Sequence, residues 1–125
     1  DFQQFSVLKA MARDLAMGIE IVPGPLVRDD DGLALSSRNV FLSPELRARA
    51  RSLHRALFAM RDSTSPRVVE RIALGWSILD ADKVDYLDIV DPETLEPVGA
   101  CDRPLRAIVC ARYGSTRLLD NVALP

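Results

Sequence analysis

Apolar positions near the N-terminus follow a helical period and then form one short continuous run. The helical set recurs at i, i+3, i+4 and i+7 and predicts an amphipathic helix over residues 3–16. Its members are Leu8, Met11, Ala12 and Leu15. The run at residues 19–22 predicts a strand, which Pro23-Gly24-Pro25 ends. A helix, a strand and a turn are typical of one unit of a parallel α/β sheet, and ligands bind such sheets beyond the carboxyl ends of their strands. Residues 23–39 therefore form a candidate site.

Two further helices are predicted in the middle of the chain. The first begins with Ser43 as N-cap, Pro44 at the first helical position and Glu45 in the first turn. It continues to residue 61, with an apolar stripe made of Leu46, Ala50, Leu53, Leu57 and Met60. The second follows a loop at 62–66 and extends to about residue 80. Its expected buried face consists of Val69, Ile72, Ala73, Trp76 and Leu79, with Trp76 as a core anchor.

After Asp80 the apolar period changes to two, which predicts strands. We expect one around residues 84–90, a second over 105–113 and a third over 116–122. Gly114-Ser115 provides turn chemistry between the last two, so an antiparallel hairpin is predicted there. Helices followed by hairpin-connected strands predict a small α+β unit.

Composition excludes several classes of protein. The 125 residues fit one domain, and 48% hydrophobic with 27% charged residues is ordinary for a globular chain. A net charge of −2 with interspersed acids and bases argues against nucleic-acid binding, and no segment is apolar enough for a membrane span or a signal peptide. Cys101 and Cys110 lack metal-ligand spacing, which predicts reduced thiols in a cytoplasmic protein and no metal site. Because the chain opens at Asp1 without Met and enters a helical pattern at once, we expect it to be a piece of a longer polypeptide.

The most distinctive stretch is polar and lies at residues 30–39. It carries the adjacent hydroxyls of Ser36 and Ser37 and the guanidinium of Arg38, all hydrogen-bond donors. Converging donors with a planar cation suit a phosphate-bearing ligand. An ordinary loop that caps the next helix is the alternative interpretation of the same residues.

Three other polar residues have a structural and a functional interpretation each. Asp1 is expected to cap the first helix, although Asp1 and Gln4 could instead point into a site. His54 is the single histidine and lies beside an apolar stripe. We expect a packed or surface histidine rather than a catalytic base, because no Cys, Ser or acidic pattern accompanies it.

Four segments together resemble one enzyme family. Residues 31–39 read Asp-Gly-Leu-Ala-Leu-Ser-Ser-Arg-Asn and are similar to the D-G-L-A-[ML]-S-S-R-N signature of the pantothenate synthetases (pantoate–β-alanine ligases). Residues 1–4 resemble the end of that family's G-x-K-D-[YF]-Q-Q motif, and residues 22–28 its V-x-x-P-x-V-R segment. Residues 114–121 resemble its terminal G-x-T-R-L-I-D-N strand.

The resemblance implies an adenylate-forming ligase of the nucleotidyltransferase superfamily that shares HIGH and KMSKS motifs. Pantoate and ATP, accompanied by Mg²⁺, would give pantoyl adenylate and pyrophosphate, and the amine of β-alanine would then displace AMP to give pantothenate. Carried over by residue, Ser36, Ser37 and Arg38 would form the catalytic phosphate loop. Leu35 would lie against adenine, and Val27 would meet adenine through its backbone. Asp1 would contact the ribose, and Gln4 would bind pantoate.

The family's N-terminal half is absent from this sequence, including its HIGH-like motif. The resemblance therefore implies the C-terminal portion of the enzyme, inactive by itself. Residues 1–26 would be a helix-plus-strand remnant of a Rossmann-like nucleotide-binding domain, and residues 27–125 a lid domain of helices on a short antiparallel sheet. The family implies a homodimer. A non-catalytic lid or dimerisation module, or another adenylylating transferase with a different acid substrate, remains an alternative.

Overall fold

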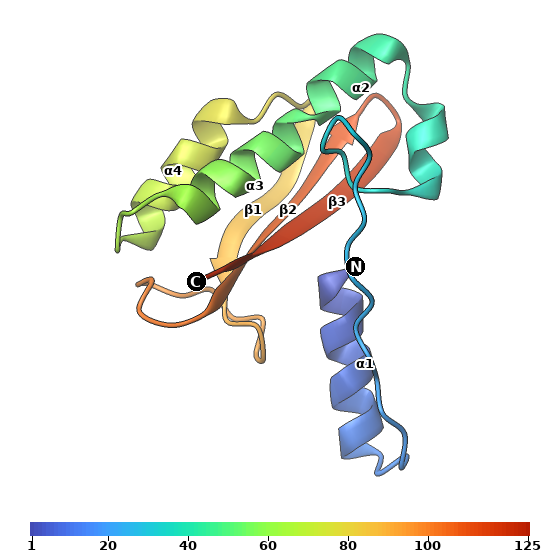
Figure 1. Ribbon diagram of the computed structural model, residues 1–125, viewed down its shortest axis with the longest axis vertical. Helices are drawn as coiled ribbons and strands as arrows, with labels where there is room; N and C mark the ends of the chain where they lie inside the picture. The colour runs from blue at the N-terminus through green and yellow to red at the C-terminus, as the bar shows by residue number, and fades with distance from the viewer.

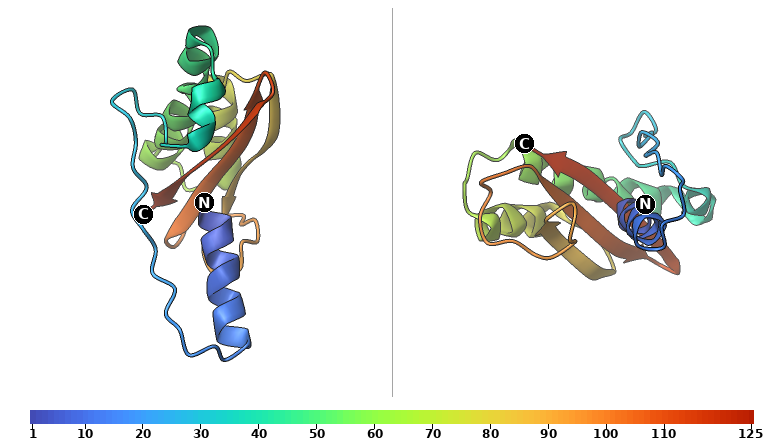
Figure 2. Two further views of the ribbon diagram at one scale, coloured as in Figure 1. Left: turned by 90° about the vertical axis from the view of Figure 1, so that its right-hand side faces the viewer. Right: turned by 90° about the horizontal axis from the view of Figure 1, so that it is seen from below.

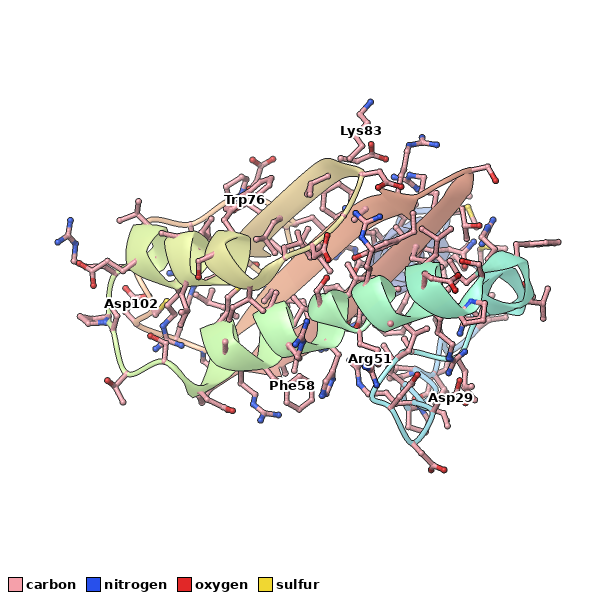
Figure 3. The ribbon with its side chains drawn as sticks, turned by 90° about the horizontal axis from the view of Figure 1, so that it is seen from above. Asp29, Arg51, Phe58, Trp76, Lys83 and Asp102 are labelled. Carbon is pink, nitrogen blue, oxygen red and sulfur yellow. The ribbon has the colours of Figure 1, made fainter.

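One antiparallel sheet forms the base of the computed structural model, which describes residues 1–125. Its strands are β1 (Lys83–Val90), β2 (Leu105–Tyr113) and β3 (Thr116–Leu124), in the order β1-β2-β3. Helices α3 (Ser52–Asp62) and α4 (Val68–Ile78) lie side by side over one face of this sheet (Figures 1 and 3). The predicted α+β unit is confirmed.

Alternate positions of the strands face the helices and form the core. Leu53, Leu57 and Met60 of α3 are fully or almost fully buried against Ile89 and Val109 of the sheet. Burial of this apolar surface is the main force that holds the two layers together. The two hydroxyls in the core are paired: the Ser52 hydroxyl lies 3.2 Å from the Tyr113 hydroxyl and accepts from the Asp80 backbone N–H at 3.0 Å.

The predicted hairpin is confirmed at residues 113–116. Tyr113 pairs with Thr116 across a two-residue loop whose first member, Gly114, has φ +59°. Glycine accepts such a left-handed conformation without a steric penalty. The Gly114 N–H also donates to the Asp82 carboxylate at 2.6 Å, which ties the turn to the start of β1.

The helix predicted over residues 44–61 has a local break. Ser43 caps α2 (Pro44–Ala50) as expected, because its hydroxyl accepts from the Leu46 N–H at 3.3 Å. Arg51 separates α2 from α3 but keeps helical angles (φ −60°, ψ −16°), so the apolar stripe continues from one helix to the next.

The predicted buried face of α4 was partly right, because Ile72 and Leu79 pack against the core, but Val69, Ala73 and Trp76 are exposed. Val68, Arg71 and Gly75 are buried, whereas Val69 and Trp76 are exposed by 62% and 48%. Gly75 determines the orientation, since a Cβ there would come within 2.5 Å of the Met60 sulfur. Trp76, the next residue around the helix, consequently lies outside the core (Figure 3).

Buried Arg71 is satisfied by backbone carbonyls. Its guanidinium donates to Ser65 at 2.7 Å and to Met60 at 3.3 Å.

Cys101 and Cys110 are free thiols, as predicted.

The strand predicted at residues 19–22 is absent, so the helix-plus-strand remnant is only half present. The segment is extended and runs back along α1 (Phe2–Asp14), away from the three-stranded sheet (Figures 1 and 2). A strand requires a neighbour for its N–H and C=O groups, and no such neighbour lies beside this run.

Helix α1 forms where predicted, but its apolar stripe is uncovered. Ala12 is its one buried residue, and Leu8, Met11 and Leu15 are exposed by 39%, 43% and 67%. Only the first turn meets the sheet, where the Arg106 guanidinium lies 4.1 Å from the centre of the Phe2 ring.

We expect Leu57→Ala to lower the free energy of unfolding by about 2–5 kcal/mol, because it leaves a cavity in the core. Trp76→Ala should cost about 1 kcal/mol or less, since the side chain is half exposed. Chemical denaturation of both variants measures the difference. An equal loss of stability in the two variants would contradict the half-exposed position of Trp76.

Candidate functional site

Backbone hydrogen bonds fold residues 27–39 into a compact loop, here called the signature loop. The Leu35 N–H donates to the Val27 carbonyl at 3.0 Å, and the Asp29 N–H donates to the Leu33 carbonyl at 2.9 Å. A turn at Gly32 joins the two sides, with its N–H on the Asp29 carbonyl at 2.9 Å. These backbone hydrogen bonds hold the loop in its shape without a ligand.

Gly32 and Leu33 anchor the loop to α3. Gly32 has φ +86°, and a Cβ at this position would come within 2.7 Å of the His54 ring. Leu33 is 2% exposed and belongs to the main core. Both the backbone angle and the close approach therefore require glycine at position 32.

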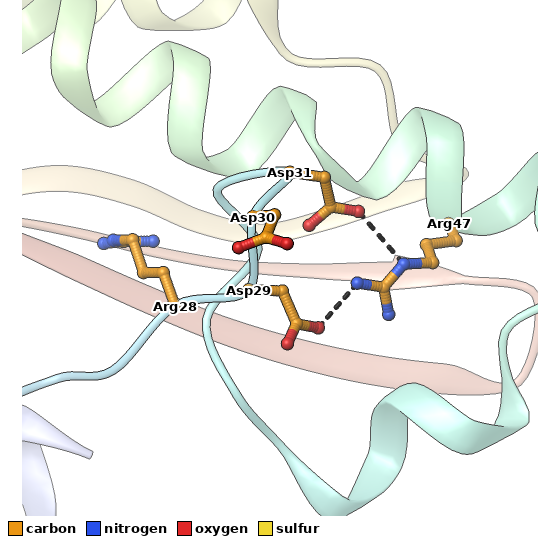
Figure 4. A pocket seen from close by; sticks show the side chains of 5 residues that line it. All are labelled: Arg28, Asp29, Asp30, Asp31 and Arg47. Atoms are coloured by element: carbon orange, nitrogen blue, oxygen red, sulfur yellow. Dashed lines mark hydrogen bonds and ion pairs between the residues drawn. The ribbon is translucent and has the colours of Figure 1, made fainter.

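Two of the loop's acidic residues are clamped by an arginine of α2. Arg47 donates to Asp29 at 2.6 Å and to Asp31 at 3.0 Å, as Figure 4 shows. Burial alone would raise the pKa of Asp31. Hydrogen bonds from the Leu33 N–H and from Arg47 outweigh burial and hold that pKa below its usual value. The hollow beside them is lined entirely by charged residues, of which Arg47, Asp29 and Asp31 pair with one another.

A buried ion pair joins the loop to the sheet. Arg28 points away from Arg47 (Figure 4) and donates twice to the Asp120 carboxylate of β3, at 2.6 and 2.8 Å. The Asp120 side chain is 1% exposed and that of Arg28 is 17% exposed. Arg28 also donates to the Gly32 carbonyl at 3.0 Å, so one guanidinium holds both the turn and the strand.

Sequence analysis did not foresee the Arg28–Asp120 pair. The sequence offered one indication of the pair, since Arg28 and Asp120 lie in two of the segments that carry the family resemblance.

The predicted phosphate residues occupy the exposed end of the signature loop. Ser36 caps a short 3₁₀ helix, η1 (Ser37–Phe41), by accepting from the Arg38 N–H at 3.2 Å. This bond uses a lone pair of the Ser36 oxygen and leaves the hydroxyl proton free to donate. Ser37 and Arg38 are exposed, and neither side chain forms a hydrogen bond within the protein.

Arg38 borders a hollow of about 300 Å³ between η1 and the β2–β3 turn. The other residues that line it are Phe41, Ser115, Thr116 and Arg117. The interpretation as a helix cap therefore applies to Ser36. Arg38, which lines an open hollow, remains compatible with the interpretation as a phosphate site.

The other predicted site residues form two groups. Val27 and Leu35 are exposed by 57% and 56% and lie together, as the Leu35–Val27 backbone bond requires. Asp1 caps α1 by accepting from the Gln4 N–H at 3.1 Å, and both of these residues are exposed. No hydrogen bond or ion pair joins Asp1 or Gln4 to residues 36–38. The neighbouring Gln3, which sequence analysis passed over, accepts from the Tyr86 hydroxyl at 2.7 Å.

His54 is a packing residue, as expected. Its ring centre lies 4.0 Å from that of Phe58, and its Nδ1 is buried without a hydrogen-bond partner. Burial, followed by the charge of Arg28, lowers the pKa of His54.

No helix of the structure is both long and apolar enough to cross a bilayer.

Comparisons with known proteins agree with one another. The family model described as pantoate-beta-alanine ligase matches residues 1–123. A pantothenate synthetase of Rubrobacter xylanophilus is 47% identical over 135 aligned positions, which cover 100% of this chain and 45% of that protein. The chain thus spans less than half the length of the curated relatives it matches.

Solved structures show the same fold. A crystal structure of pantothenate synthetase from Thermus thermophilus superposes with a TM-score of 0.92 at 45% identity, covering 98% of this chain and 46% of that one. The pantoate-beta-alanine ligase of Francisella tularensis, solved with beta-gamma ATP and beta-alanine, has a TM-score of 0.63 at 23% identity, covering 98% and 40%.

Substituting Gly32 tests the anchoring of the loop. Gly32→Ala should lower the free energy of unfolding by roughly 1–3 kcal/mol, because alanine strains the left-handed backbone and meets the His54 ring. Gly24→Ala is the matched control, since no atom lies within 4 Å of a Cβ there. Equal stability of the two variants in chemical denaturation would contradict the close approach.

The environment of His54 predicts a pH dependence. Because its pKa is lower in the folded state, the unfolded chain takes up the proton first, and stability falls as the pH drops through about 6.5. Relative to His54→Phe, the wild-type chain should lose stability between about pH 7.5 and 5.5. Carboxylates common to both proteins cancel in this difference. Parallel stability profiles would show that His54 does not titrate differently on folding.

Proposed function

The chain belongs to the pantoate–β-alanine ligase family, and on this basis we propose that it is the C-terminal portion of an ATP-dependent ligase that makes pantothenate. In the first step a pantoate carboxylate oxygen attacks the α-phosphorus of ATP, and the bond to the bridging oxygen breaks to release pyrophosphate. In the second step the β-alanine amine attacks the acyl carbon of pantoyl adenylate, and AMP leaves. ATP enters as a substrate together with its Mg²⁺.

One observation carries this proposal, namely the division of roles within residues 31–39. Asp31, Gly32 and Leu33 fix the loop, and the Asn39 amide donates to the Ala34 carbonyl at 3.0 Å. The side chains of Ser37 and Arg38 form no hydrogen bond within the protein and are exposed to solvent. A rigid loop that presents a guanidinium and hydroxyls outward suits an anionic ligand.

The chemistry requires this kind of loop. Negative charge shifts onto the departing phosphates during adenylation, and fixed donors aimed at it stabilise the transition state. Arg38 would bind the phosphates through its guanidinium, with Ser36 and Ser37 as hydroxyl donors. Leu35, directly before these residues, would lie against adenine, and the neighbouring Val27 would meet adenine through its backbone.

The remaining contacts would be completed by a part of the ligase outside these residues. Asp1 and Gln4, at the exposed first turn of α1, would meet the ribose and pantoate. The uncovered stripe of α1 supports this view, because contiguous exposed apolar surface marks an interaction site. In this proposal residues 1–26 belong to a nucleotide-binding domain and residues 27–125 to a lid, and the chain alone is inactive. A cytoplasmic homodimer remains our expectation for the whole enzyme.

A second candidate is a non-catalytic lid or dimerisation module. It is favoured by the main core, which draws all its residues from positions 33–124 and so does not depend on α1. Pantoate-dependent AMP formation by the full-length protein separates the two candidates, since a module without catalytic residues would not support it. Activity with a different acid in place of pantoate would identify another adenylylating transferase.

Arg38→Ala in the full-length ligase should lower kcat/KM for ATP about 100-fold, because a fixed donor to the phosphates is lost. The melting temperature should hardly change, since the side chain is exposed and unpaired. AMP release on adding pantoate, ATP and β-alanine measures activity. Arg55→Ala, another exposed arginine on α3, is the control and should retain full activity. Parallel losses of activity and melting temperature in Arg38→Ala would indicate a structural role instead.

A further inference from the structure

The hollow between η1 and the β2–β3 turn brings together two arginines from distant parts of the chain. Arg38 comes from the signature loop and Arg117 from the start of β3, and both line the hollow of about 300 Å³. Ser115 of the turn and Thr116, the first residue of β3, line the same hollow. Arg117 lies in the segment 114–121 that carries the family resemblance, but neither the resemblance nor the predicted site assigned it a role.

Arg117 is held so that its terminal nitrogens remain available. Its Nε donates to Asp85 of β1 at 2.7 Å, and no intramolecular bond engages either terminal nitrogen. The side chain is 42% exposed, so these donors are accessible to a ligand. Asp85 therefore pairs with one edge of the guanidinium, and the terminal donors stay free for a second anion.

The charge around Asp85 is not balanced by that single carboxylate. Arg112 lies 3.5 Å from Asp85 and Lys83 lies 3.9 Å from it, in addition to Arg117. The hydrogen bond from Arg117 outweighs burial and lowers the pKa of Asp85, so the acid stays ionised near neutral pH. Three cations around one anion leave a net positive charge at the cluster to which Arg117 belongs, and such a charge attracts an anionic ligand.

We propose that Arg117 is a second phosphate-binding residue that, together with Arg38, holds the β- and γ-phosphates of ATP and the pyrophosphate formed from them. This inference rests on the proposed function. The triphosphate carries more negative charge than one guanidinium neutralises, and two arginines that line one hollow can supply donors to adjacent phosphates. Arg112 and Lys83 do not line the hollow and are left out of the site.

Arg117→Ala in the full-length ligase tests the proposal. We expect KM for ATP and the inhibition constant of pyrophosphate each to rise about 10- to 100-fold, because a charge-assisted contact to phosphate is lost. KM for pantoate and for β-alanine should stay unchanged. Arg117→Lys should recover part of the effect, since it keeps the charge but not the paired donors.

Arg103→Ala is the matched control. Arg103 is similarly exposed and also pairs with an aspartate, Asp91, but it precedes β2, at the opposite end of that strand from the hollow. This variant should keep the wild-type constants for ATP and pyrophosphate.

Asp85→Asn separates phosphate binding from a structural role. If Arg117 binds phosphate, removing the competing carboxylate leaves pyrophosphate inhibition as strong as in the wild type or stronger. If Arg117 serves only to pair with Asp85, Asp85→Asn reproduces the weakened inhibition of Arg117→Ala, which would overturn the inference.

The outcome for the wild-type enzyme distinguishes this inference from the proposed function. Absence of pantoate-dependent exchange between ATP and pyrophosphate in the wild type would refute the ligase function itself. Normal exchange in the wild type together with unchanged ATP and pyrophosphate constants in Arg117→Ala would refute only the role of Arg117.

Discussion

The position of the signature loop depends on the buried ion pair between Arg28 and Asp120. Each charge would be unfavourable alone in this environment, and the two-fold hydrogen bond compensates both. Removing one partner of such a pair typically costs about 3–5 kcal/mol, since the other charge is left buried without compensation. The pair fixes the loop to β3, the strand whose second residue is Arg117. The proposed phosphate contacts on η1 and on β3 thereby share one rigid support.

Residues within the loop divide into those that shape it and those that it presents. Gly32 allows the turn and Leu33 enters the core, while Arg47 clamps Asp29 and Asp31 from outside. These interactions are satisfied within the protein and need no ligand. Arg38 is left exposed on a backbone that does not have to reorganise when an anion arrives, and such preorganisation favours charge stabilisation. Most residues of this sequence motif therefore hold the loop in shape, and only a few are exposed to a ligand.

The molecule has one well-covered layer and one uncovered helix. Apolar side chains of α3 and of the sheet are enclosed, whereas Leu8 and Met11 of α1 and its C-cap residue Leu15 are in contact with solvent. The N-terminal helix is attached mainly through its first turn, by Phe2 and Gln3. This asymmetry agrees with a chain that spans less than half the length of its relatives. In the proposed enzyme the same helix joins the lid to the nucleotide-binding part, so its uncovered stripe would be an internal domain contact.

Features that depend on neighbouring residues were determined by the sequence alone. The cap at Ser43, the turn at Gly114 and the strand periods of residues 84–124 follow from side chains within a few positions of each other. Tertiary structure decided what required a distant partner. The run at 19–22 has the composition of a strand but no strand beside it, and Trp76 lies outside because Gly75 fits against Met60. Arg28 and Asp120 are 92 positions apart, and it is the fold that brings Arg38 and Arg117 to the same hollow. Local periodicity carries no information on such pairings, since burial and charge compensation are properties of the assembled layers.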